Sequence, residues 1–127
     1  MRAETDRRLQ DAMRRSLRRL RRLASLAELR RLADAGTPVF VLFTAEGCDH
    51  CEDALFTVAD LVRRHETSVV VCWASLEDNH DIILNYAVTE YPSAIVLRRG
   101  GQPVRISGRE IADPGSARRA LNAASRR

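Results

Sequence analysis

The stretch that most constrains the fold is Phe-Thr-Ala-Glu-Gly-Cys-Asp-His-Cys, at residues 43–51. A run of β-forming residues, 39–43, leads into it, and apolar residues at helical spacing follow it. Cys48 and Cys51 therefore form a C-x-x-C pair where a strand gives way to a helix. The N-terminus of a helix stabilises a thiolate, because its free N–H groups and positive dipole end favour negative charge. This placement predicts a lowered pKa for the Cys48 thiol.

Length and composition narrow the class of protein. The chain has 127 residues, 45% of them hydrophobic, which suits one domain with a modest core. No run of about 18 apolar residues occurs, so we expect no membrane-spanning helix. The arginine-rich start lacks the apolar segment of a secretory signal, and Glu4, Asp6 and Asp11 argue against a mitochondrial presequence. We therefore expect a cytoplasmic protein, in which a C-x-x-C pair is catalytic or metal-binding rather than a structural disulfide.

Positive charge is concentrated at the N-terminal end. Residues 1–35 hold eleven Arg against five acids, whereas residues 36–127 hold ten Arg against twelve acids. Within residues 3–22, apolar side chains recur on one helical face and Arg fills most of the rest, which predicts a basic amphipathic helix. We expect this extension, residues 1–24, to pack on the domain or self-associate; an acidic partner, an anionic surface or disorder are the alternatives.

The remaining chain, residues 25–127, alternates between strands and helices. We expect helices at 25–35, 51–65, 78–87 and 113–124, and strands at 39–43, 68–73, 94–97 and 104–107. Ser25 and Glu28 have the form of a capping box, and Asp113-Pro114 places an N-cap before proline. Residues 20–24 fit either the end of the first helix or a short strand. The order predicts an α/β fold, a mixed sheet of four or five strands with helices on both faces.

Four motifs recur in one known family. They are the strand at 39–43, Cys48-Asp49-His50-Cys51, Tyr91-Pro92-Ser93 before the next strand, and the Arg99-Gly100-Gly101 turn. With these motifs in this order, residues 25–124 resemble the thioredoxin superfamily. The resemblance implies a thioredoxin-like fold and a cis peptide bond before Pro92.

The resemblance also implies roles for particular residues. Cys48 matches the exposed nucleophile and Cys51 the resolving cysteine of a redox-active disulfide, with no other cofactor. Tyr91 matches the residue whose backbone pairs with a substrate segment by strand addition. Together with Gly47, Pro92 and Trp73, it is expected to form the substrate-binding surface. The partners implied are a protein or peptide disulfide and a thiol reductase or oxidant.

Several positions depart from the family pattern. Typical thioredoxins have tryptophans where this chain has Thr44 and Gly47, a buried aspartate where it has Leu42, and a lysine where it has Trp73. The aspartate is thought to help deprotonate the resolving cysteine, so Cys51 needs another proton acceptor here. Water, His50 and Glu46 are the candidates. The departures predict a specialised relative rather than a general-purpose thioredoxin.

Three side chains beside the cysteines are expected to modulate them. His50 favours a thiolate when it is protonated, Asp49 opposes one by its charge, and Glu46 is a second acid nearby. The direction of electron flow stays open. A cytoplasmic location favours a reductase, whereas a His before the second cysteine resembles the disulfide isomerases and periplasmic oxidases.

Zinc is the rival use of these residues. A structural zinc site needs four ligands, and no second pair at ligand spacing accompanies Cys48, Cys51 and His50, so we expect no metal. Cys72 lies within an apolar run and is expected to be a buried core residue.

The favoured function is thiol–disulfide exchange with protein or peptide substrates through Cys48 and Cys51. One alternative is a thioredoxin-like binding or adaptor module with little redox turnover. Another is a redox-sensing regulator that uses the basic helix.

Overall fold

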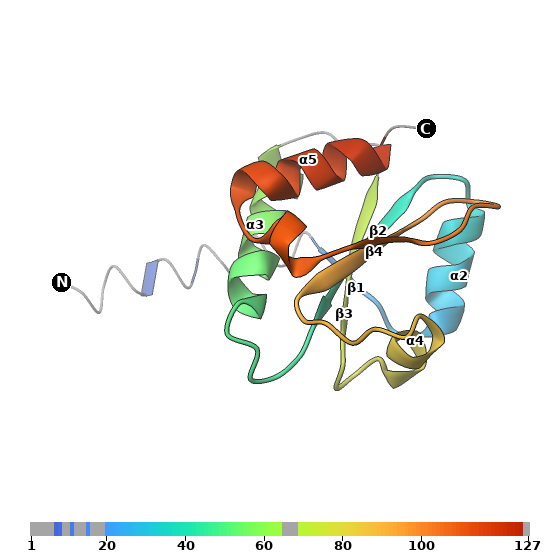
Figure 1. Cartoon of the computed structure of the whole chain (residues 1–127), viewed down its shortest axis with the longest axis horizontal. Coiled ribbons are helices and arrows are strands. Elements are labelled where there is room, and N and C mark those ends of the chain that lie inside the picture. The colour runs from blue at the N-terminus through green and yellow to red at the C-terminus, as the bar shows by residue number, and fades with distance from the viewer. Residues whose placement is uncertain (1–6, 9–10, 12–14, 16–19, 65–68, 126–127) are drawn as a thin grey trace.

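A computed structural model describes residues 7–8, 11, 15, 20–64 and 69–125 of the chain. A central sheet carries helices on both faces (Figure 1). The elements are β1 (Arg21–Arg22), α2 (Leu26–Asp34), β2 (Val39–Thr44), α3 (Cys51–Arg64), β3 (Val70–Ser75), α4 (His80–Asn85), β4 (Ser93–Leu97), β5 (Val104–Ile106), the short 3₁₀-helix η1 (Gly108–Ile111) and α5 (Pro114–Ser125). The α/β fold predicted from the sequence is confirmed.

The sheet has five strands in the order β1-β3-β2-β4-β5. β1, β3 and β2 run parallel, whereas β4 and β5 are antiparallel to their neighbours. The chain therefore crosses from β3 over to the far side of β2 and returns in the opposite direction as β4. β3 begins and ends two residues later than the sequence predicts, because its pairing with β2 continues to Ser75 opposite Thr44.

The core lies on both faces of the sheet, and β2 divides it. Phe40 and Leu42 pack into a cluster with α3 and α5, and the alternate residues of β2 pack into a second cluster with α2 and α4. Every residue of β2 is buried. This confirms the prediction that an uninterrupted apolar run forms a central strand.

Local signals start and stop the helices where the sequence predicts. Ser25 Oγ accepts a hydrogen bond of 3.2 Å from the Glu28 N–H at the start of α2. Gly36, with φ of +98°, ends that helix in a left-handed conformation. At the start of α5, Asp113 Oδ1 accepts a hydrogen bond of 2.8 Å from the Ser116 N–H.

Residues 20–24 add a strand to the sheet edge. Arg21 and Arg22 pair with Cys72 and Trp73, so of the two alternatives left open for residues 20–24 the short strand is right, and the basic helix does not reach residue 22. The cause is burial, because Leu20 and Leu23 enter the clusters on opposite faces of the sheet. The strand is fastened at its end, where the Asn79 side chain donates a hydrogen bond of 3.0 Å to the Leu23 carbonyl.

Most of the predicted basic helix lies outside the described residues. Its described members, Arg7, Arg8, Asp11 and Arg15, are helical and exposed. Among the described residues, no helix is both long and apolar enough to cross a membrane.

Candidate redox site

Cys48 and Cys51 form a disulfide at the end of the loop between β2 and α3, with their Cα atoms 5.4 Å apart. Cys48 is half-exposed, whereas Cys51 is only 4% exposed. The helix begins at Cys51, in agreement with the helix predicted over residues 51–65. The Cys51 N–H donates to the carbonyl of Cys48 at 3.3 Å, a turn of i to i+3 type that precedes the regular helix. Cys48 therefore stands just ahead of the helix N-terminus.

The loop before Cys48 is held from two directions. Gly47 has a φ of +73°, a conformation that a side chain disfavours, and space around it is open. The Glu46 N–H donates a hydrogen bond of 2.9 Å to Glu77, which follows β3. The Cys48 N–H donates back to the Ala45 carbonyl at 3.4 Å. These contacts fix the path of the chain into the cysteine pair.

One cavity, of about 690 Å³, opens beside the disulfide. Its lining comes from β1, the ends of β2 and β3, and the start of α3: Arg22, Thr44, Ala45, Glu46, Gly47, Cys48, Asp49, Cys51, Glu52, Leu55, Trp73, Ser75, Glu77 and Asp78. We call it the Cys48 cavity. Besides the two cysteines, it gathers four of the predicted site residues: Glu46, Gly47, Asp49 and Trp73. His50 does not line it.

Trp73 forms one wall of the Cys48 cavity. Its indole N–H donates a hydrogen bond of 2.8 Å to Thr44 Oγ1. The Arg22 guanidinium lies 5.0 Å from the centre of the indole ring, a cation–π distance, and it also pairs with Asp78. Sequence reasoning missed Arg22, because only the pairing of β1 with β3 brings it to the site.

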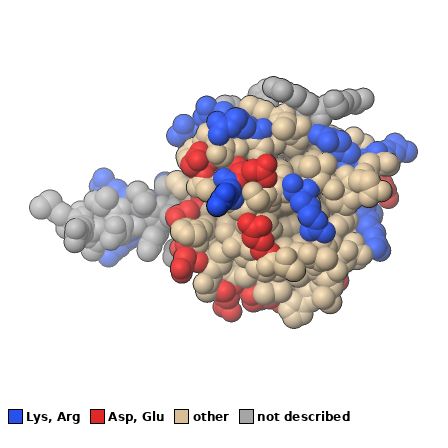
Figure 2. All heavy atoms as spheres, in the orientation of Figure 1, with Lys and Arg blue, Asp and Glu red and all other residues tan. Residues whose placement is uncertain are grey.

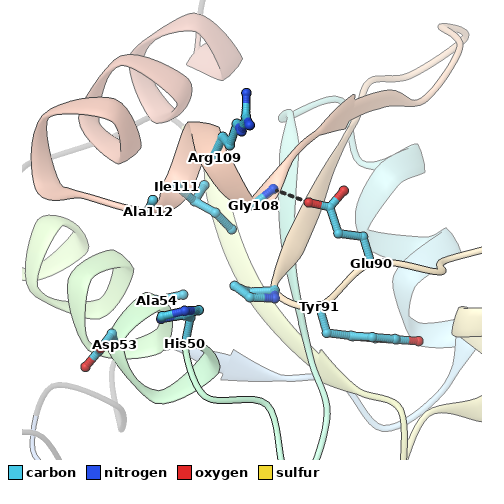
Figure 3. Close-up of a pocket in the computed structure, with 10 residues that line it drawn as sticks. His50, Asp53, Ala54, Glu90, Tyr91, Gly108, Arg109, Ile111 and Ala112 are labelled. Atoms are coloured by element: carbon cyan, nitrogen blue, oxygen red, sulfur yellow. Dashed lines mark hydrogen bonds between the residues drawn. The ribbon is translucent and has the colours of Figure 1, made fainter.

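A second cavity, of about 430 Å³, lies on the other side of the motif (Figure 3). We call it the Pro92 cavity. It is lined by His50, Asp53, Ala54, Glu90, Tyr91, Pro92, Gly108, Arg109, Ile111 and Ala112. The two residues between the cysteines are thus divided, since Asp49 lines one cavity and His50 the other.

The Pro92 cavity is built on a close approach of two backbone segments. The Tyr91–Pro92 peptide bond is cis. The Gly108 N–H donates a hydrogen bond of 2.9 Å to Glu90, drawn as the dashed line in Figure 3. A Cβ atom at Gly108 would lie 2.8 Å from the Pro92 carbonyl oxygen, so only glycine fits. Sequence reasoning missed Gly108, although a glycine directly after the last strand was the available signal.

Tyr91 turns its ring away from the cavity, as Figure 3 shows. The ring packs against the cluster on the α2 and α4 side, and its hydroxyl donates to the Val88 carbonyl at 3.4 Å. Burial raises the pKa of the Tyr91 hydroxyl. Its backbone, rather than its ring, therefore borders the Pro92 cavity.

Cys72 is chemically separate from the pair. It is fully buried in β3, and this burial raises the pKa of its thiol to about 11. At neutral pH it stays protonated and is a poor nucleophile. Among the described residues, no group of three or more His, Cys, Asp and Glu side chains could hold a metal ion.

Comparison with known proteins identifies the family. The sequence model of the family Thioredoxin matches residues 28–114, more than half of the chain. The chain belongs to the thioredoxin family. A comparison with the curated proteins finds no match.

Solved thioredoxin structures share the fold. Mitochondrial thioredoxin 3 from Saccharomyces cerevisiae, in its oxidized form, superposes with a TM-score of 0.71 at 21% identity, covering 85% of this chain and 98% of that one. Thioredoxin from Fasciola hepatica gives 0.72 at 24% identity, covering 83% and 99%. Oxidised thioredoxin from Plasmodium falciparum gives 0.70 at 16% identity, covering 84% and 99%. At these identities the likeness establishes the fold alone.

Two of the positions at which this chain departs from the typical thioredoxin pattern, Leu42 and Trp73, lie side by side in the sheet. Leu42, at the position of the usual buried aspartate, is 0% exposed and packs in the apolar cluster with α3. Trp73 lies opposite Leu42 on the neighbouring strand. Hydrocarbon and an indole ring therefore stand where the family usually has a buried acid and a lysine. Family membership and the bonded pair point, in general terms, to a thiol–disulfide oxidoreductase.

Proposed function

We propose that this protein exchanges disulfides with protein or peptide substrates, with Cys48 as nucleophile and Cys51 as resolving cysteine. The observation that carries the proposal is the unequal exposure of two bonded sulfurs. Cys48 is half-exposed at the mouth of a cavity, whereas Cys51 is buried in the first turn of α3. An incoming disulfide can reach the first and not the second.

The exchange balances in atoms and electrons. The reduced Cys48 thiolate attacks one substrate sulfur, and the substrate S–S bond breaks as a Cys48–substrate disulfide forms. The departing substrate sulfur takes a proton. The Cys51 thiol then loses its proton and attacks Cys48, which releases the second substrate sulfur as a thiol. Two electrons pass to the substrate, and the Cys48–Cys51 disulfide is the product.

The proton of Cys51 needs an acceptor other than a buried acid, because Leu42 occupies that position. We assign solvent in the open Cys48 cavity as this acceptor, since both cysteines line it. Asp49, His50 and Glu46 modulate the thiolate by their charge rather than by taking part in bond making. Helix α3 stabilises the Cys48 thiolate through the N–H groups of its first turn.

The substrate chain is proposed to cross the Pro92 cavity. The ring of Tyr91 points toward the core, so its backbone borders the Pro92 cavity, where we propose that it pairs with an extended segment. Pro92, Gly47 and Trp73 complete the contact surface on either side of the disulfide. A reducing compartment such as the cytoplasm is the proposed setting, because there a thiol reductase can regenerate the dithiol.

Reduction of insulin by dithiothreitol tests the proposal through the turbidity of the precipitating B chain. The wild-type protein should accelerate the reaction strongly, and Cys48→Ser should abolish the acceleration. Cys72→Ala is the matched control, since it removes a thiol that is buried away from the cavities. If the wild type were no faster than dithiothreitol alone, the enzyme function would be rejected. The alternative, a binding or adaptor module with little redox turnover, would then be favoured.

The reduction potential of the pair gives the direction of electron flow. Equilibration with glutathione buffers, followed by thiol trapping, measures it. A value near about −270 mV fits a reductase and one near about −120 mV an oxidant. The apolar side chain of Leu42, at the position of the family's buried acid, and the acids around Cys48 both disfavour a thiolate, so we expect the reductase end of this range.

A further inference from the structure

We infer that this protein prefers disulfides whose cysteines are flanked by basic residues. The inference rests on the proposed exchange function and names the substrate class of the same site. Five acids line the Cys48 cavity, and we call them the acidic rim: Glu46, Asp49, Glu52, Glu77 and Asp78. The reacting sulfur of Cys48 lies among them, so any substrate that exchanges there meets their charge.

The acidic rim runs against the charge of the whole chain. The protein carries 21 Arg and 17 acids, yet the cavity holds five acids and a single Arg. That arginine, Arg22, pairs with Asp78 and so cancels one acid only. In Figure 2, acidic residues gather at the left and lower edges of the domain, whereas basic residues gather along its upper and right edges. Residues 36–127, which supply all five acids, hold ten Arg against twelve acids, so five acids against one Arg in a single cavity is a local concentration of negative charge.

Three members of the rim are available to a substrate. Glu46, Asp49 and Glu52 are exposed. The ion pairs found among the described residues join Arg21 to Glu28, Arg22 to Asp78, and Arg63 and Arg64 to Asp60, and so include none of the three. Glu77, in contrast, already holds the Glu46 N–H. The free rim therefore offers three negative charges around one reactive sulfur.

The Pro92 cavity lacks this bias. Asp53 and Glu90 line it together with Arg109 and His50, and Glu90 already accepts from the Gly108 N–H. Charge recognition is thus confined to the Cys48 side. Oppositely charged surfaces raise association rates by tenfold or more at low salt, and salt screens the effect. The preference for basic substrates should therefore appear in the rate at which Cys48 attacks the substrate disulfide.

The test uses three short peptides that differ only beside one cysteine, where the flanking residues are arginine, serine or glutamate. Each cysteine carries a chromogenic aryl thiol in disulfide linkage, and reduced full-length protein releases it. We expect the arginine peptide to react about tenfold faster than the glutamate peptide at low salt. The ratio should fall toward one in molar salt, where the screening length is only about 3 Å. The net charge of +4 on the whole chain would by itself produce the opposite preference.

A pair of charge variants locates the effect. Glu46→Gln/Glu52→Gln removes two rim charges, and the ratio of arginine to glutamate peptide rates should drop at least threefold. Asp11→Asn/Asp34→Asn removes two exposed charges outside both cavities and should leave the ratio near the wild-type value. Equal loss in both variants would mean that net charge, not the rim, sets the preference, and would overturn the inference.

The serine peptide separates this inference from the proposed function. If it reacts faster with wild type than with Cys48→Ser, exchange at Cys48 stands whatever the charge preference. Equal rates for the arginine and glutamate peptides would then overturn the substrate class alone. No reaction with any of the three peptides would overturn the exchange function itself.

Discussion

The two cavities beside the disulfide are built on different principles. The Cys48 cavity is wide and charged, and Arg22 and Trp73, which are paired on neighbouring strands, form one wall of it. The Pro92 cavity is smaller, and it depends on a backbone contact so close that Gly108 has no room for a side chain. Close backbone packing thus shapes one side of the motif, and charge distinguishes the other. We propose that the Pro92 cavity holds the substrate chain by its shape and that the Cys48 cavity selects the substrate by charge.

Leu42→Asp should produce the largest effect, because it restores the family's acid to a position without exposure to solvent. We expect a loss of about 4 kcal/mol in the free energy of unfolding at neutral pH, since the carboxylate would be buried in an apolar cluster. Burial raises the pKa of such a carboxyl above its unfolded value. The loss should therefore shrink as pH falls below the pKa of the folded state. Urea unfolding at several pH values measures it.

Leu42→Asn is the matched control for the acid. It buries a polar group of the same size without a titrating proton, so its destabilisation should not depend on pH in this range. If Leu42→Asp were as stable as wild type and faster in insulin reduction, the fold would not require an apolar residue at position 42, which would contradict this prediction.

Gly108→Ala tests the other cavity. The added Cβ would meet the Pro92 carbonyl oxygen at 2.8 Å and Glu90 at 3.1 Å, so the two segments must separate. We expect a loss of about 2 to 3 kcal/mol and a fall in insulin reduction. Gly101→Ala is the control, because its Cβ would make only ordinary contacts of 3.6 Å with Arg98. Equal stability of the two variants would contradict a close-contact role for Gly108.

The Cys72 thiol, which lines neither cavity, should make the stability of the protein depend on pH. Its pKa is raised by burial to about 11, from an ordinary value of 9.0. Between these values the unfolded chain loses the proton first, so stability is complete below about pH 9 and declines as pH rises toward 11. The contribution lost is about 2 kcal/mol. Comparing urea unfolding of wild type and Cys72→Ala from neutral to alkaline pH isolates it, since the advantage of the wild type should shrink.

Trp73→Phe should have the smallest effect. It keeps most of the ring under Arg22 and loses the indole N–H that donates to Thr44. We expect a loss of about 1 kcal/mol. Thr44→Val removes the acceptor instead, and a double-mutant cycle gives the coupling between the two side chains. A coupling near zero would mean that the hydrogen bond does not stabilise this wall of the Cys48 cavity.

The sequence predicts those parts of the fold that rest on local patterns. The buried strand β2 and the helix starts at Ser25 and Asp113 follow from neighbouring residues alone. β1 does not, because two residues carry no periodicity and their pairing with Trp73 joins distant segments. The start of α3 at Cys51 agrees with the helix predicted over residues 51–65, whereas the turn before it depends on one hydrogen bond, from the Cys51 N–H to the Cys48 carbonyl, that residue spacing does not give.

The candidate site divides in the same way. The cysteine pair and Pro92 were found from motifs, whereas Arg22, Glu77 and Gly108 come to the site only through the packing of separate strands and loops. The separation of Asp49 from His50 also depends on side-chain direction, which spacing does not give. Local motifs therefore predict the reacting residues, whereas long-range contacts determine which other residues line the site.

The shortness of the two outer strands has a consequence for the proposed exchange with protein substrates. β1 pairs through two residues and β5 through three, against five or six in the inner strands. An exposed strand edge is a template on which a foreign extended segment can stack. Edge strands this short offer little such template. A protein substrate would therefore bind mainly at the disulfide. Release after exchange is then governed by the site and not by the rest of the sheet.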